Sequence, residues 1–190
     1  MRAITTLVLV LLMSLSPSPG LAQQSASSPA PASAESDRLR QALILLLADV
    51  RSASAVLSAR SSYDDYMVRI GKIEKRLASI RSKHQVALSR GDHKALGAPL
   101  SDACAALYAA ASDWKQMRLA ANEVAAAQRS VAHAAAWEVD FYQRQLQDAQ
   151  GKHTEAQKRL SDHTATALAF TQTATRAQEA AKKPAVTVRK

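Results

Sequence analysis

The fold is decided by residues 101–182, which read SDACAALYAAASDWKQMRLAANEVAAAQRSVAHAAAWEVDFYQRQLQDAQGKHTEAQKRLSDHTATALAFTQTATRAQEAAK. This stretch holds one glycine, no proline and two tryptophans, and alanine recurs at nearly every other turn of a helix. Alanine has the highest helix propensity but stabilises little when it is buried. We therefore predict one very long helix, or two helices in near register.

Two sets of residues in this stretch repeat every seven positions: Met117, Val124 and Val131, and Leu107, Trp114 and Ala121. A strict seven-residue repeat produces a left-handed supercoil, so the helix should wrap around a partner helix. The large residues return after Val131 with a shift of one position, which predicts a stutter and not a helix end. Four aromatic residues are candidate packing or interaction anchors: Trp114, Trp137, Phe141 and Tyr142.

Two apolar stripes at helical spacing precede the long stretch. The first runs from Leu39 to Leu57 and the second from Tyr63 to Ile80, out of phase with the first. They predict a continuous or kinked first arm over 37–89, with a break capped by Ser62 as the alternative. Two glycines and a proline predict a turn at 90–98.

Pairing across this turn defines the expected fold class. The chain is all-α, an elongated antiparallel helical hairpin or coiled coil with a second arm over 99–151 and a third helical segment over 152–182. If the turn is centred near Lys94, Leu45 of the first arm lies opposite Gln143 of the second. The third segment carries few large apolar residues, so it should be the least protected part, either projecting or folding back into a three-helix bundle.

The amino terminus reads as an export signal. Residues 1–22 combine Arg2, a short apolar run and small residues before a cleavage point near Ala22, as in a cleaved secretory signal peptide. Residues 23–36 form a low-complexity Ala/Ser/Pro leader, and residues 183–190 a basic tail. We expect a periplasmic or secreted protein.

The formal net charge is +9, and part of it gathers on one predicted helix face. That face consists of Arg69, Lys72, Arg76, Lys83 and Arg90. Such a charge run is ordinarily a solvated outer face. The functional alternative is a surface for an anionic lipid, lipopolysaccharide or an acidic polymer.

Catalytic and metal-binding sets are not found in the sequence. The five histidines show no ligand spacing, and there is no nucleophile turn, phosphate-binding loop or dinucleotide fingerprint. The single cysteine, Cys104, is interpreted as a small buried hydrophobe, with an intermolecular disulfide as the alternative. We expect no cofactor, no metal and no enzymatic activity.

These observations favour a protein that works through contacts. The leading hypothesis is an exported scaffold, adaptor or chaperone-like envelope or secretion component that binds a protein partner or itself through helices. The alternative is a binding module for anionic ligands, and a nucleic-acid partner is not expected. The chain is similar to envelope chaperones and pilus-associated secretion components only in size, charge and helicity, and such a likeness assigns no function.

Overall fold

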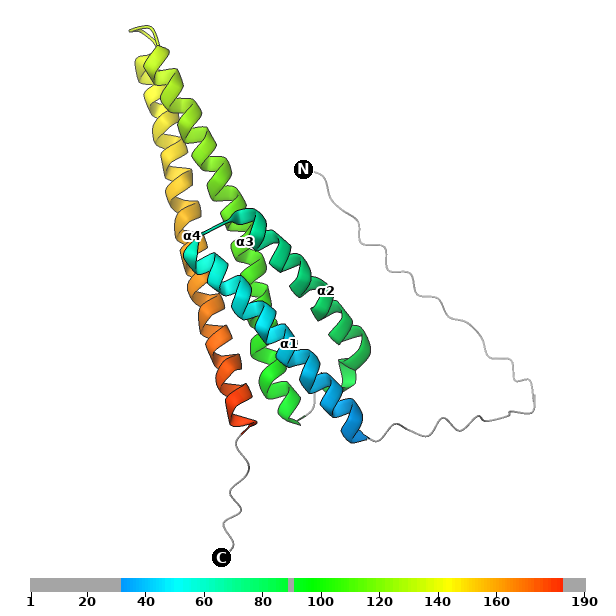
Figure 1. The fold of residues 1–190 in the computed structure, drawn as a ribbon. Coiled ribbons are helices and arrows are strands. Elements are labelled where there is room, and N and C mark those ends of the chain that lie inside the picture. The colour runs from blue at the N-terminus through cyan, green and yellow to red at the C-terminus, as the bar shows by residue number, and fades with distance from the viewer. Residues whose placement is uncertain (1–31, 89–90, 183–190) are drawn as a thin grey trace, which may run out of the picture. The chain divides into compact units, whose positions relative to one another are not determined.

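The structure, a computed structural model, describes residues 32–88 and 91–182. Across these two ranges it contains four α-helices and no strand: α1 (Ala32–Ala59), α2 (Tyr63–Leu88), α3 (Gly91–His133) and α4 (Val139–Ala180) (Figure 1). The prediction of an all-α fold is confirmed.

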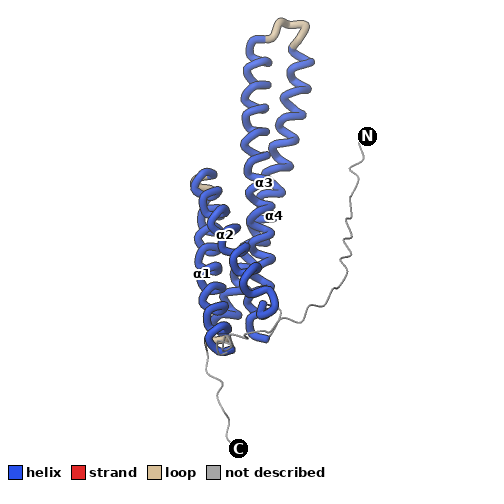
Figure 2. Tube along the Cα trace, turned by 90° about the vertical axis from the view of Figure 1, so that its right-hand side faces the viewer, coloured by secondary structure: helices blue, strands red, loops and turns tan. Residues whose placement is uncertain are grey.

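The four helices belong to one folded unit and form two antiparallel hairpins of unequal length. α3 and α4 pack against each other along their lengths, while the shorter α1–α2 hairpin covers one end of that pair. α1 contacts all three other helices, whereas α2 contacts α1 and α3 only. Figure 2 shows that α3 and α4 continue well beyond α1 and α2. The unit therefore has a four-helix base and a two-helix projection, where the sequence predicted a single hairpin or a three-helix bundle.

The predicted first arm is broken between α1 and α2. Arg60 adopts a left-handed conformation (φ 48°), and the Asp65 N–H donates to Ser62 Oγ at 3.2 Å. Ser62 thus caps α2, as the alternative interpretation had it. At the other end of the arm, α1 begins at Ala32, inside the segment predicted to be a disordered leader.

The predicted turn at 90–98 is too long, because α3 already begins at Gly91 and runs through Pro99. α2 and α3 run in opposite directions on either side of residues 89–90, so the chain does reverse near the predicted place (Figure 1). Leu96 and Leu100 are buried there and hold this first part of α3 in the base. A further reversal lies at 134–138, where we expected only a stutter. Consequently Leu45 does not face Gln143.

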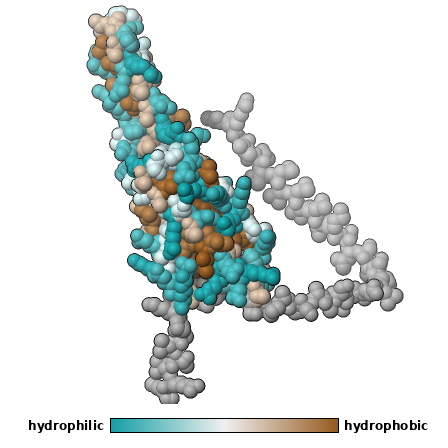
Figure 3. All heavy atoms as spheres, viewed as in Figure 1, coloured by the Kyte–Doolittle hydropathy of each residue, from teal (hydrophilic) through white to brown (hydrophobic). Residues whose placement is uncertain are grey.

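The core of the base comes from the two predicted apolar stripes. On α1 the buried stripe includes Leu39, Leu43, Leu46, Val50, Ala53 and Leu57, and on α2 it includes Tyr66, Ile70, Ile73, Leu77 and Ile80. These side chains pack against α3, where Leu100, Leu107 and Trp114 are buried. Figure 3 shows strongly apolar residues gathered toward this end of the unit, while the projection is largely hydrophilic.

The second half of α4 is held more firmly than the sequence suggested. Leu160, Ala167 and Ala174 are fully buried. α1 also bonds to α4 through polar groups, since Arg51 donates to Thr175 Oγ1 at 2.8 Å. Most of the segment 152–182 is therefore part of the base. The projection consists of the last part of α3, the turn at 134–138 and the first part of α4.

Several expectations fall on residues outside the described ranges. These are the signal peptide with its cleavage near Ala22, most of the leader, Arg90 and the basic tail. The described chain opens with an apolar helix, whose part Ala34–Ala59 is long and apolar enough to cross a membrane by length and composition. In the structure, 44% of the most apolar 18-residue stretch of this helix is buried against the other helices. The core helix of a folded protein can have the same length and composition.

Candidate interaction site at the hairpin tip

The tip of the projection is a short, ordered turn between α3 and α4. The Glu138 N–H donates to the Ala135 carbonyl at 2.8 Å, which closes a turn with Trp137 at its third position. The Glu138 carboxylate reaches back and accepts from the Ala135 N–H at 3.2 Å. Two reciprocal hydrogen bonds therefore hold the tip, although it contains neither glycine nor proline.

Large aromatic side chains are exposed on this turn. Trp137 is 83% exposed and Phe141 is 60% exposed. Phe141 packs edge-on against Tyr142, with ring centroids 5.3 Å apart. The predicted register, with Leu45 opposite Gln143, would bring this cluster against α1. It is wrong, because α1 belongs to the base and the cluster lies at the far end of the projection.

Two of the predicted anchors have other roles. Trp114 is 5% exposed and packs on Tyr63 and Tyr66, at centroid distances of 5.7 and 5.4 Å. It anchors the core of the base. Tyr142 is half-buried beside Phe141. Of the four predicted anchors, only Trp137 and Phe141 are exposed to solvent.

Below the tip, the helix pair of the projection has an alanine core. The residues buried between the helices there are Ala120 and Ala127 on α3 and Ala149 and Ala156 on α4. Each pair is separated by seven residues, which is the spacing of a coiled-coil seam. A seven-residue repeat is therefore present, but it runs through other positions than predicted: Ala121 is exposed, and Met117, Val124 and Val131 are only half-buried.

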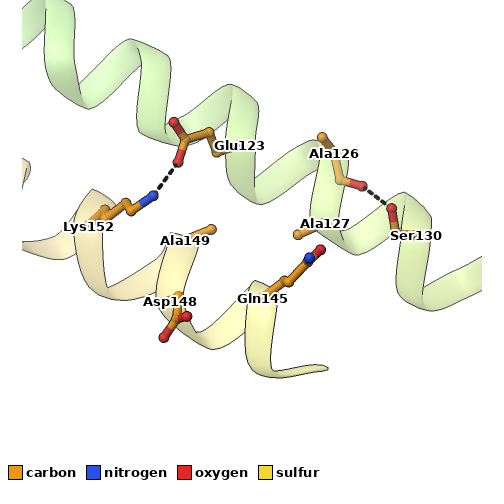
Figure 4. A pocket seen from close by; sticks show the side chains of 8 residues that line it. All are labelled: Glu123, Ala126, Ala127, Ser130, Gln145, Asp148, Ala149 and Lys152. Carbon is orange, nitrogen blue, oxygen red and sulfur yellow. Dashed lines mark hydrogen bonds and ion pairs between the residues drawn. The ribbon is translucent and has the colours of Figure 1, made fainter. Parts of the chain in front are cut away.

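Small core residues leave an open groove on one face of the projection. It has a volume of about 400 Å³ and is lined by Glu123, Ala126, Ala127, Ser130, Gln145, Asp148, Ala149 and Lys152. Figure 4 shows Ala127 and Ala149 between the two helices and, at one end, the ion pair from Lys152 Nζ to Glu123 Oε2, which is 3.1 Å long. A smaller hollow of about 200 Å³ continues beyond this ion pair, beside Leu119 and Ala156.

The predicted basic face is partly neutralised by neighbouring acids. Arg76 pairs with Asp49 of α1 at 2.6 Å, and Arg69 pairs with Asp65 at 3.2 Å. Arg69 also donates to Ser52 of α1. Lys72 and Lys83 are exposed. Two of the five predicted cations therefore hold the α1–α2 hairpin together and are not free for a ligand.

Polar groups between the helices of the base have structural partners. Asp113 is nearly buried and contacts His163 Nδ1 at 2.6 Å and Arg159 Nε at 3.3 Å. This cluster joins α3 to α4 where the base gives way to the projection. Within the described residues, no group of three or more His, Cys, Asp or Glu side chains is arranged to hold a metal ion.

Cys104 is fully buried in the base, and burial raises the pKa of its thiol to about 12. Thiol–disulfide exchange requires an accessible thiolate. The folded unit therefore keeps Cys104 away from a second chain, in keeping with its interpretation as a small packed hydrophobe.

Comparison with known proteins adds no relative. No protein-family model matches the chain, and neither a curated protein nor a solved structure is significantly similar to it.

Proposed function

We propose that this protein is an exported helical adaptor or scaffold, without enzymatic activity, that binds a protein partner through the aromatic tip of its α3–α4 hairpin. One observation carries the proposal: Trp137 is 83% exposed on a turn that hydrogen bonds hold in place. An exposed, preorganised tryptophan loses little conformational freedom on binding, and tryptophan is among the residues that dominate interface energies.

The charges around the tip favour a protein over a membrane as the partner. Glu138 and Asp140 flank the aromatic side chains, the exposed Arg144 lies one turn further along α4, and Asp140 has no ion pair among the described residues. Acidic groups are repelled by the anionic surface of a bilayer. The partner that fits is a protein with an apolar pocket for the Trp137 indole and basic side chains near Asp140.

The location follows from the amino terminus. Residues 1–22 have the pattern of a secretory signal, and we propose cleavage near Ala22 and a periplasmic or secreted mature protein. A long hairpin suits that role, because it carries the contact site away from the base. Mass spectrometry of the protein from the envelope fraction of the native cell checks the cleavage, and a mature chain that still begins at Met1 would contradict it.

A photo-crosslinking amino acid at position 137 tests the partner proposal in the native envelope. The matched control places it at Leu45, which is 52% exposed but lies on the base. We expect one defined protein to crosslink from position 137 and not from position 45. That protein, once purified, should bind the Trp137→Ser variant at least about tenfold more weakly than the natural chain.

Two outcomes would contradict the proposal. One is the same set of crosslinked proteins from positions 137 and 45. The other is unchanged binding by Trp137→Ser of a folded protein. Crosslinking to lipid in place of protein would show that the tip enters a membrane, and it would overturn the choice of partner.

The alternative function, a module for anionic ligands, has weaker support. Arg69 and Arg76 are committed to acidic groups, so Lys72 and Lys83 are the cations of that face left exposed in the described part of the chain. It would predict salt-sensitive binding to anionic vesicles that is lost when Lys72 and Lys83 are changed to glutamine.

A further inference from the structure

The projection carries both halves of a self-complementary contact on one face. On α4, Phe141, Gln145, Asp148 and Lys152 follow one another at intervals of four, three and four residues, so they share a face. Three of these residues line the 400 Å³ groove, and the fourth, Phe141, is the exposed aromatic ring nearest to it along that face. A protruding ring and a hollow therefore lie side by side.

The α3 helix shows the same arrangement on the same side. Leu119, Glu123, Ala126 and Ser130 recur at the same intervals, and all four line one of the two hollows. Leu119 is 47% exposed at the end away from the tip. The other side of α4 is polar, since it presents Gln143, Gln147, Gln150 and Thr154. The face with the groove differs in two respects: it carries the exposed Phe141 ring, and alanines lie between the charged side chains that line its hollow.

We infer that two copies of this chain associate through this face, antiparallel and across a twofold axis, with Phe141 of each copy seated over the groove of the other. A twofold interface requires one surface to offer both the knob and the hole, and this face offers both. The inference goes beyond the proposed partner contact and does not depend on it.

The spacing along α4 sets the overlap of the two copies. Phe141 precedes Asp148 by seven residues, about 10 Å along a helix. Seating each ring at the level of Asp148 makes the two hairpins overlap from Trp137 to Lys152, about 22 Å. Each Trp137 then reaches the level of the exposed Lys152–Glu123 ion pair of the other copy, where the ammonium group can lie over the indole ring while it keeps its carboxylate partner. Gln145 of each copy falls next to the axis.

The overlap also predicts the strength of association. Two helices side by side are about 20 Å wide, so the footprint on each copy is roughly 440 Å². Stable interfaces bury about 800 Å² on each partner, and smaller ones are transient. We therefore expect a concentration-dependent equilibrium between monomer and dimer. Because a dimer covers Phe141, a protein partner at the tip would compete with the second copy.

Sedimentation velocity of the purified full chain over a range of concentrations measures the association. The weight-average mass should rise from that of one chain toward twice that value. Ala126→Arg, in the groove, should abolish the rise, whereas Ala125→Arg, exposed on the same helix but outside the groove, should leave it unchanged. Phe141→Ser should weaken dimerisation at least about tenfold.

Cysteine crosslinking tests the geometry independently of affinity. Gln145→Cys lies near the proposed axis and should give a disulfide-linked dimer under mild oxidation, while Gln147→Cys, on the opposite side, should not. The native Cys104 is fully buried, so the chain without an added cysteine should give no disulfide-linked dimer and is the control. A protein that stays monomeric up to about 0.5 mM would overturn the inference, because a dimer with a dissociation constant near or below that concentration would be detected there. Equal crosslinking through positions 145 and 147 would overturn it as well.

The two proposals fail separately. Ala126→Arg leaves Trp137 and Phe141 in place, so it should keep the tip-dependent crosslink to a partner while removing the dimer. A monomeric protein that still crosslinks from position 137 would refute self-association alone.

Discussion

The two tryptophans should respond to truncation in opposite ways. Trp137 is 83% exposed at the tip, whereas Trp114 is 5% exposed and packs on Tyr63 and Tyr66 in the base. Trp137→Ser should leave the free energy of unfolding almost unchanged. Trp114→Ala should lower it severely, because it leaves a cavity among the four helices of the base.

The magnitudes follow from the buried areas. A tryptophan that becomes fully buried removes roughly 250 Å² from water. Trp137 buries the remaining 17% (100 − 83), or about 40 Å², which is about 1 kcal/mol at most. Trp114 buries nearly all of its area, and truncations of such residues cost about 3–5 kcal/mol.

Urea denaturation followed by far-ultraviolet circular dichroism measures both costs. Fluorescence gives a second readout, because each single variant reports the tryptophan that remains. Trp137→Ser should show the blue-shifted emission of a buried indole, and Trp114→Phe the emission of an indole in water. A loss above about 2 kcal/mol for Trp137→Ser would show that the tip is packed and would refute the argument for an exposed contact site.

Three further predictions concern the base. Asp113→Ala should lower the free energy of unfolding by about 2 kcal/mol in thermal or urea denaturation, because it removes two charge-assisted contacts of a nearly buried carboxylate. The control Asp148→Ala removes an exposed carboxylate and should change the free energy of unfolding very little. Equal losses for the two variants would contradict this prediction. Burial raises the pKa of Cys104 to about 12, so stability should be constant below about pH 9 and fall above it by at most about 1.4 kcal/mol per pH unit from this group. Cys104→Ala should flatten that slope in urea titrations between about pH 9 and 10, below the range in which Tyr66 and Tyr108, whose pKa values burial also raises, contribute; an unchanged slope there would exclude this cause. Arg60→Gly should stabilise by about 0.5–1 kcal/mol, since glycine adopts the left-handed conformation without strain; a loss of stability would show that the Arg60 side chain matters more.

The elements of the base could be read from the sequence because their signal is chemical contrast. The stripes of α1 and α2 consist of large apolar residues at helical spacing, and the structure buries them as predicted. The seam of α4 escaped notice for the opposite reason. It repeats every seven residues through Ala149, Ala156, His163 and Phe170, and most of these residues carry no strong hydrophobic signal. Reading alanine as a core residue would have revealed it.

The turn at the tip was not predicted, because hydrogen bonds between Ala135 and Glu138 stabilise it and it contains no glycine or proline. Glycine and proline at 91–99 predicted a turn over residues that already belong to α3, whereas the chain reverses at 134–138 through alanines, Trp137 and the carboxylate of Glu138. The hydrogen bond from the Ala135 N–H to Glu138 spans three residues, so a search for a side chain that can reach back would have marked the place. Misplacing this turn put the aromatic cluster in the core.

By itself, the sequence determined that the chain is helical, that α1 and α2 bury the stripes predicted for them, and that the long second half pairs with a seven-residue repeat. These properties are local, since propensity and periodicity act over a few turns of helix. Only the tertiary structure decided which segments pair, because the pairing depends on burial summed over residues that lie far apart in the sequence. That choice moved Trp137 and Phe141 from the expected core to an exposed tip, and thereby changed a packing cluster into the candidate binding site.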